Sequence, residues 1–121
     1  MIALILAGMI LTGKASWYDS KSACKYNPDP KCPTASGRSL YALEKEETET
    51  TNHFAASWDF PFGARIKVTN VRTGKYTVFT VWDRGPSRKL HNRIVDLSCK
   101  GFQEIADPKE GIIPVIIEVI N

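Results

Sequence analysis

The fold is decided by the stretch Arg65-Ile66-Lys67-Val68-Thr69-Asn70 and by the run at 75–83 that follows it. Apolar and polar residues alternate strictly in the first part, as they do in a strand with one buried face. Gly74 marks a turn between the two runs, which therefore form a hairpin. Both faces of the second strand are largely apolar, which is typical of a strand that is covered on each side. This strand ends at Asp83, where Arg84-Gly85-Pro86 stops it.

Further short strands flank the hairpin. We predict them at 14–18, 94–97 and 111–120, where apolar residues gather between turn residues. Pro114 in the last run indicates an edge position or a bulge. Ser98 is a good N-cap for a helix that runs to about residue 106. Many short strands with one clear helix and no internal repeat predict a small, mainly-β barrel.

The composition describes an ordinary globular protein. Its 121 residues suffice for one domain, and 43% of them are hydrophobic while 24% are charged. The net charge of +3 favours an anionic wall or membrane surface only mildly. No basic stripe is interleaved with aromatic residues, so we expect no nucleic-acid partner. The acidic stretch from Leu40 to Thr51 predicts a solvated loop or a frayed helical turn.

The first residues form an apolar run at 1–12. This run is shorter than the ~20 residues of a membrane-spanning helix, but it suits the apolar part of a secretory signal. No positive charge precedes it, and a buried first strand is the alternative. We expect a partial signal at 1–12, a folded domain at 13–121 and an exported protein. No cysteine lies near the run, so we expect no lipid anchor.

The sequence contains three cysteines. Cys24 and Cys32 flank a turn-rich loop, which a disulfide would close in an oxidising compartment. Cys99 is then left as a small buried hydrophobe. A zinc site is the sharper alternative, but the spacing differs from that of structural zinc sites and there are only two His. A nucleophilic Cys99 would need a base, and the sequence pairs none with it.

Five short motifs follow one another along the chain. They are Ala15-Ser16-Trp17-Tyr18, Thr34-Ala35-Ser36-Gly37, the stretch from Pro61 to Asn70, Asp83-Arg84-Gly85-Pro86, and the stretch from Arg93 to Ser98. Together they resemble the rare lipoprotein A (RlpA) family over about 13–120. The resemblance implies a six-stranded double-psi β-barrel with one or two short helices, shared with expansins. It also implies endolytic lytic transglycosylation of peptidoglycan strands that lack stem peptides, a periplasmic or wall-facing location, and no cofactor or metal.

Asp83 matches the family's catalytic aspartate before Arg-Gly-Pro. Glycosidic cleavage needs an acid to protonate the leaving oxygen, and such a group contributes roughly 10²–10⁴ in rate. In a lytic transglycosylase the 6-hydroxyl of muramic acid then attacks the anomeric carbon, so one carboxyl can serve as acid and then as base. Arg84 would hold Asp83 ionised or face the glycan, and Trp82 could desolvate the carboxyl. From the residue alone, the alternative is that Asp83 only orders a turn.

Two positions depart from the family pattern. Arg38 stands where the family has Glu, and Ser57 stands where it has His. His53 is a candidate replacement, whereas Ser57 can form hydrogen bonds but cannot act as an acid or base near neutral pH. Core packing is the alternative for each aromatic residue in the site. The residues that we predict to bind substrate are Tyr18, Thr34, Arg38, Trp58, Trp82 and Arg84.

Two functions of different classes fit this sequence. The first is an RlpA-type lytic transglycosylase that uses Asp83. The second is a non-catalytic, expansin-like barrel that binds cell-wall glycan, which the replacements Arg38 and Ser57 favour. A third hypothesis is a partner of cell-division or wall-assembly proteins. We expect a monomer in each case.

Overall fold

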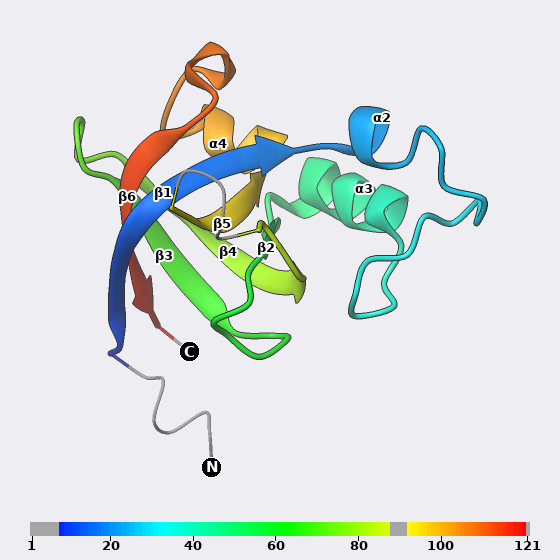
Figure 1. Ribbon diagram of the computed structural model, residues 1–121, viewed down its shortest axis with the longest axis horizontal. Coiled ribbons are helices and arrows are strands. Elements are labelled where there is room, and N and C mark those ends of the chain that lie inside the picture. Colours follow the sequence, from blue (N-terminus) through cyan, green and yellow to red (C-terminus); the bar gives the residue numbers. More distant parts are fainter. Residues whose placement is uncertain (1–7, 88–91, 121) are drawn as a thin grey trace.

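A closed β-barrel forms the body of the computed structural model, which describes residues 8–87 and 92–120 (Figure 1). The order of the strands around the barrel is β1-β5-β2-β4-β3-β6. The pairs β1–β5 and β2–β4 are parallel, and the other neighbours are antiparallel. This confirms the predicted mainly-β, six-stranded fold. The strands are β1 (Ile10–Tyr18), β2 (His53–Ala56), β3 (Arg65–Asn70), β4 (Tyr76–Asp83), β5 (Arg93–Ser98) and β6 (Ile113–Val119).

The barrel interior is filled by the alternating residues of the hairpin and its neighbours. Ile66 and Val68 of β3 are fully buried, as are Phe79 and Val81 of β4. Each such side chain contributes roughly 1.5–3 kcal/mol by leaving water. Asn70 ends the buried row of β3, and its amide donates to the Ile105 carbonyl at 2.8 Å. The hairpin therefore sets the core, as its sequence pattern predicts.

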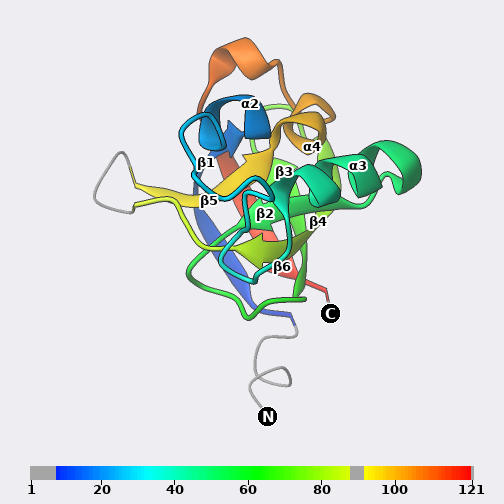
Figure 2. The same ribbon diagram turned by 90° about the vertical axis from the view of Figure 1, so that its right-hand side faces the viewer.

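Three short α-helices and a 3₁₀ helix accompany the barrel in the described residues, where one or two short helices were predicted. They are α2 (Ser20–Ala23), α3 (Leu40–Thr50), α4 (Cys99–Gln103) and the 3₁₀ helix η1 (Pro108–Glu110). Figures 1 and 2 show α2 and α3 beyond one end of the barrel. The helices within the described ranges include none that is long and apolar enough to cross a membrane. Ser98 caps α4 by accepting from the Gly101 amide, as predicted.

The prediction of a loop or frayed turn at 40–51 is wrong. Helix α3 occupies Leu40–Thr50, and the Ser39 hydroxyl accepts from the Ala42 amide at its start. Leu40 and Leu43 are buried against the barrel end, and so is Glu47 one turn further on. The sequence did not reveal this narrow buried face, because the face includes Glu47, which is one of the run of glutamates.

The strand ends also differ from the prediction. Ile10 to Thr12 pair with β6, so the last part of the range 1–12 belongs to the barrel. Residues 1–7, on which most of the predicted signal falls, lie outside the described residues. The prediction of an edge position or a bulge at Pro114 is wrong, because β6 is paired on both sides and Pro114 lies opposite Lys14 of β1. Pro114 lies one residue beyond the last β3–β6 pair, Asn70–Val115, so it removes no hydrogen bond from that ladder.

A second, smaller apolar cluster fixes the loop after β1. Cys24 and Cys32 are joined by a disulfide with an S–S distance of 2.12 Å. The bridge packs with Leu40, Leu43 and Phe54, and this cluster attaches the loop to the barrel end. Cys99 is free and only half-buried, in contrast to the expected buried position.

Candidate active site

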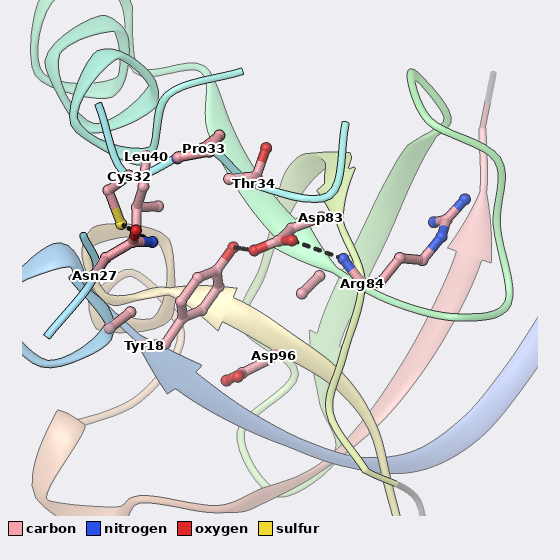
Figure 3. A pocket seen from close by; sticks show the side chains of 11 residues that line it. Tyr18, Asn27, Cys32, Pro33, Thr34, Leu40, Asp83, Arg84 and Asp96 are labelled. Carbon is pink, nitrogen blue, oxygen red and sulfur yellow. Dashed lines mark hydrogen bonds between the residues drawn. The ribbon is translucent and has the colours of Figure 1, made fainter. Parts of the chain in front are cut away.

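A pocket of about 220 Å³ opens where β1 and β4 end, beneath the disulfide-closed loop (Figure 3). Its wall combines the loop, two strand ends and the middle of β5. Two carboxyl groups, Asp83 and Asp96, face this space. The lining residues are Tyr18, Ala23, Asn27, Cys32, Pro33, Thr34, Leu40, Ala56, Asp83, Arg84 and Asp96.

The carboxylate of Asp83 is surrounded by hydrogen-bond donors. Its Oδ2 accepts from the Tyr18 hydroxyl at 3.0 Å. Its Oδ1 accepts from the backbone amides of Ala35 and Arg84, both at 2.9 Å. Donors from the end of β1, from the segment around Ala35 and from the residue after β4 thus surround the Asp83 side chain. Three donors are the surroundings that suit a negatively charged oxygen pair.

Asp96 has fewer partners and a different environment. Its Oδ1 accepts from the Ser16 hydroxyl at 3.1 Å, and that hydroxyl accepts from Arg93 Nη1 at 3.0 Å. Burial raises the pKa of Asp96 to about 6, and the negative charge of Asp83 adds to the rise. The Ser16 hydrogen bond and the Arg93 charge lower this pKa but do not cancel the effect of burial. A fraction of Asp96 therefore carries a proton near neutral pH.

Tyr18 connects the pocket to the barrel end. Its ring meets Phe54 edge-on, with centroids 5.8 Å apart and the planes at 90°. Burial, followed by the charge and hydrogen bond of Asp83, raises the pKa of the Tyr18 phenol far above its usual value. The hydroxyl therefore remains a neutral donor to Asp83, and Tyr18 occupies the cleft position predicted for it.

The two carboxyls of the pocket lie in different environments, because Asp83 accepts three hydrogen bonds while Asp96 is largely buried beside Ser16. Sequence reasoning missed Asp96, although it lay in the quoted Arg93–Ser98 motif. The available signal was an acidic residue within an otherwise apolar strand. Ser16 and Arg93 can be identified as neighbours of the Asp96 carboxyl only from the parallel β1–β5 register, which pairs Ser16 with Asp96.

Thr34 and Arg84 also line the pocket, but their polar groups hold the protein chain. The Thr34 hydroxyl donates to the Arg38 carbonyl at 2.8 Å. Arg84 Nη1 donates to the carbonyls of Ser57 and Phe60, both at 2.8 Å. Figure 3 shows the Arg84 side chain extending away from the Asp83 carboxylate. The expectation that the guanidinium pairs with Asp83 or faces the glycan is corrected accordingly.

Trp82, Arg38 and Trp58 do not line this pocket. The Arg38 guanidinium lies 4.8 Å from the centroid of the Trp82 ring and 3.4 Å from Glu46. Both residues line a different hollow, so Trp82 does not desolvate Asp83 as proposed from sequence. Trp58 is 63% exposed between β2 and β3.

His53 does not replace the missing family histidine beside Asp83. The β2–β4 register pairs Ala56 with Asp83 and places His53 opposite Phe79. The two ring nitrogens of His53 are engaged by Glu47 at 2.6 Å and by Glu104 at 2.5 Å. The predicted catalytic role therefore has no geometric support.

Ser57 is fully buried and serves the backbone. Its hydroxyl donates to the Ile94 carbonyl at 3.4 Å and accepts from the Asp59 amide at 3.1 Å. Its main-chain N–H donates to the Asp83 carbonyl at 3.1 Å.

Burial raises the pKa of the Cys99 thiol, which lowers the reactivity of this cysteine. Within the described ranges, no group of three or more acidic, His or Cys side chains is placed to hold a metal.

The strand order defines a double-psi β-barrel, and its pocket is lined by two carboxyl groups. A family model described as lytic transglycolase matches residues 10–117, and the chain belongs to this family.

Curated relatives include transglycosylases of the RlpA type. The endolytic peptidoglycan transglycosylase RlpA of Vibrio cholerae is 34% identical over 117 residues, which cover 94% of this chain and 37% of that protein. A probable RlpA of Nostoc sp. is 39% identical over 67 residues, which cover 55% of this chain and 18% of the relative. The chain thus spans well under two thirds of the length of these relatives.

Solved structures share the fold at low sequence identity. An expansin of Clavibacter michiganensis superposes with a TM-score of 0.64 at 17% identity, covering 93% of this chain and 51% of the expansin. The Streptomyces papain inhibitor superposes with a TM-score of 0.65 at 20% identity, covering 95% of this chain and 97% of that one. These likenesses establish the barrel and do not define its activity.

Proposed function

We propose that the protein cleaves peptidoglycan glycan strands by lytic transglycosylation in the Asp83–Asp96 pocket. The observation that carries the proposal is the contrast between the two carboxyls. Asp83 accepts three hydrogen bonds, whereas burial raises the pKa of Asp96 to about 6. Membership of the lytic transglycolase family and the similarity to RlpA-type enzymes support the reaction class.

In the proposed mechanism, Asp96 is the general acid that donates a proton to the glycosidic oxygen. Its carboxylic acid protonates the glycosidic oxygen while the bond to the anomeric carbon breaks. Asp83, with its donors fixed in place, stabilises the positive charge that develops on the sugar ring. The ionised Asp96 then accepts the proton of the muramic acid 6-hydroxyl, which attacks the anomeric carbon and closes a 1,6-anhydro ring. The acid role predicted for Asp83 thereby moves to Asp96.

Export and the choice of strands without stem peptides belong to the same proposal. The relatives are named for peptidoglycan, a polymer outside the cytoplasm. The Cys24–Cys32 bridge fits an oxidising compartment. The pocket has a volume of about 220 Å³, and the disulfide-closed loop forms part of its rim.

Purified glycan strands without peptides test this function. Incubation should produce new anhydromuramic ends, detected by mass spectrometry, and both Asp96→Asn and Asp83→Asn should abolish them. Glu49→Gln removes one exposed carboxylate from α3 and serves as the charge-matched control. If the wild-type protein produces no anhydro ends under conditions where it binds the strands, the proposed activity is wrong.

A non-catalytic, glycan-binding barrel is the second candidate. The observation in its favour is that Arg38 and Ser57 replace the family Glu and His, and neither of these two residues lines the pocket. An expansin of the same fold has been solved in complex with cellohexaose, with a TM-score of 0.63 at 16% identity. Binding without new ends would support this candidate in the experiment above.

A further inference from the structure

A second groove lies along the outer face of β4. It consists of two hollows of about 230 and 270 Å³. The hollows share four lining residues, so they form one continuous depression, and neither shares a lining residue with the Asp83 pocket. The shared residues are Asn52, His53, Arg65 and Thr80.

The floor of this groove is the outward row of the β3–β4 hairpin. The register places Arg65 opposite Thr80 and Lys67 opposite Val78. Side chains directly opposite one another point to the same face of a sheet. From Tyr76 to Trp82 this row spans about 20 Å at the usual rise of a strand. The groove is therefore long enough for several consecutive units of a polymer.

Aromatic rings with cations over them mark both ends. Lys67 Nζ lies 4.2 Å from the centroid of the Tyr76 ring, and Tyr76 is 59% exposed. At the other end the Arg38 guanidinium covers Trp82 at 4.8 Å. Aromatic faces beside polar groups bind ligands that have both apolar and hydroxyl-rich sides. Sugar rings have this character.

Arg65 supplies an uncommitted positive charge at the centre. It is exposed, lines both hollows, and has the uncharged Thr80 on one side. The other cations are partly balanced, because Arg38 pairs with Glu46 and Lys67 lies opposite Glu118 in β6. Among the described residues, no ion pair involves Arg65. A guanidinium in this position can bind a carboxylate through two parallel hydrogen bonds.

We infer that this groove binds an extended polysaccharide that bears carboxylate groups, with a carboxylate at Arg65 and sugar rings beside the Tyr76 and Trp82 side chains. The ligand class follows from an elongated shape, aromatic ends and a central free cation. The groove would hold a strand independently of cleavage, because the Asp83 pocket lies apart from it. Binding by this groove thus goes beyond the proposed activity.

Binding of peptide-free glycan strands, measured by calorimetry, tests the groove. The free lactyl groups of these strands supply the carboxylates, and Asp96→Asn prevents cleavage during the measurement. We expect Arg65→Gln combined with Lys67→Gln to weaken binding about tenfold, the size of one or two lost charge-assisted contacts. Lys109→Gln, which removes an exposed charge from η1, is the matched control and should leave the affinity unchanged.

A chemical control separates charge from shape. Strands whose carboxylates have been reduced to alcohols should bind weakly to the parent protein, and the double substitution should then have no further effect. Tyr76→Ala, at an exposed position, should weaken binding of both kinds of strand. Equal affinity for native and reduced strands, an equal loss in Lys109→Gln, or tighter binding of a poly(glycerol phosphate) would overturn the inference.

Discussion

Two clusters of ionisable side chains lie at the same end of this barrel and differ in how completely they are paired. In the His53 cluster, Glu47 accepts from His53 and Ser98, and the second ring nitrogen of His53 meets Glu104. In the pocket, Asp96 accepts one side-chain hydrogen bond among residues 8–87 and 92–120, from the Ser16 hydroxyl. A fully paired cluster fixes structure, whereas a group with spare capacity is available for a ligand. The presence of a histidine at this end of the barrel therefore does not by itself indicate a catalytic role.

The difference originates in register and packing. Helix α4 closes tightly over His53, since a Cβ atom on Gly101 would lie 2.2 Å from Phe79 Cε2 and 3.0 Å from His53 Cγ. The pocket opens between the disulfide-closed loop and the ends of β1 and β4. The predictions below test whether one cluster serves stability and the other activity.

Asp96→Asn should have the largest effect on activity. Loss of the proton donor should reduce the rate of glycan cleavage roughly 10²–10⁴-fold, as measured by release of anhydromuramic ends. The free energy of unfolding should stay the same or rise, because the substitution removes a desolvated carboxyl. An equally inactive variant that also unfolds at a much lower temperature would assign Asp96 to structure.

His53→Ala should have the opposite effect. It leaves Glu47, which is 4% exposed, without its main partner, and breaking a buried pair costs about 3–5 kcal/mol. Urea unfolding measures the loss, and cleavage at low temperature should persist. Glu104→Gln is the control, because the Glu104 side chain is 48% exposed and should cost under about 1 kcal/mol. Loss of cleavage in a folded His53→Ala protein would return His53 to the active site.

The two clusters should also respond differently to pH. Asp96 must be protonated to act as an acid, so kcat/KM should fall as pH rises above about 6. For stability, the raised pKa of Asp96 means that its contribution is complete below 3.8 and is lost as pH rises to about 6. A pH profile of kcat/KM that stays flat from pH 5 to 8 would exclude Asp96 as the acid.

His53 governs stability at higher pH. Burial alone lowers its pKa, but the hydrogen bonds and charges of Glu47 and Glu104 raise it above 6.5 overall. The stabilisation is thus fully present below pH 6.5 and disappears as pH rises through the folded-state value. The free energy of unfolding should fall as pH rises through this range in the parent protein and in Lys109→Gln. In His53→Gln this dependence on pH should be lost.

Tyr18→Phe should give the smallest change. It removes one of three donors to Asp83 and keeps the ring against Phe54. One hydrogen bond to a charged carboxylate is worth about 1.5–3 kcal/mol, so cleavage should slow roughly 10- to 100-fold. The comparison is with Tyr41→Phe, an exposed tyrosine on α3, which should change nothing. A complete loss of activity in Tyr18→Phe would make the phenol itself a reacting group.

The sequence predicted the parts of the molecule that depend on local pattern. Strict alternation at 65–70 and the turn at Gly74 predicted the hairpin, and five ordered motifs predicted the barrel. Helix α3 was missed because its buried face includes Glu47, whose partner His53 lies six residues further on. Charge patterning could not reveal a buried ion pair.

The site was predicted only in part, because its geometry is set by strands far apart in sequence. Asp83 and Tyr18 were expected together and are hydrogen-bonded. Asp96 joins them only when β5 pairs with β1, which no local pattern reveals. Arg84 was expected to act on Asp83 because it is its neighbour in the chain, yet its guanidinium binds the main chain at Ser57.

The Cys24–Cys32 bridge has a consequence for the timing of activity. Ala35, whose amide donates to Asp83, lies shortly after Cys32 and just outside the loop that the bridge closes. In a reducing compartment this segment would be held less firmly, and one of the three donors to Asp83 would no longer be fixed. Under the proposed function, the site would then stay incomplete before export, and oxidation outside the cell would complete it.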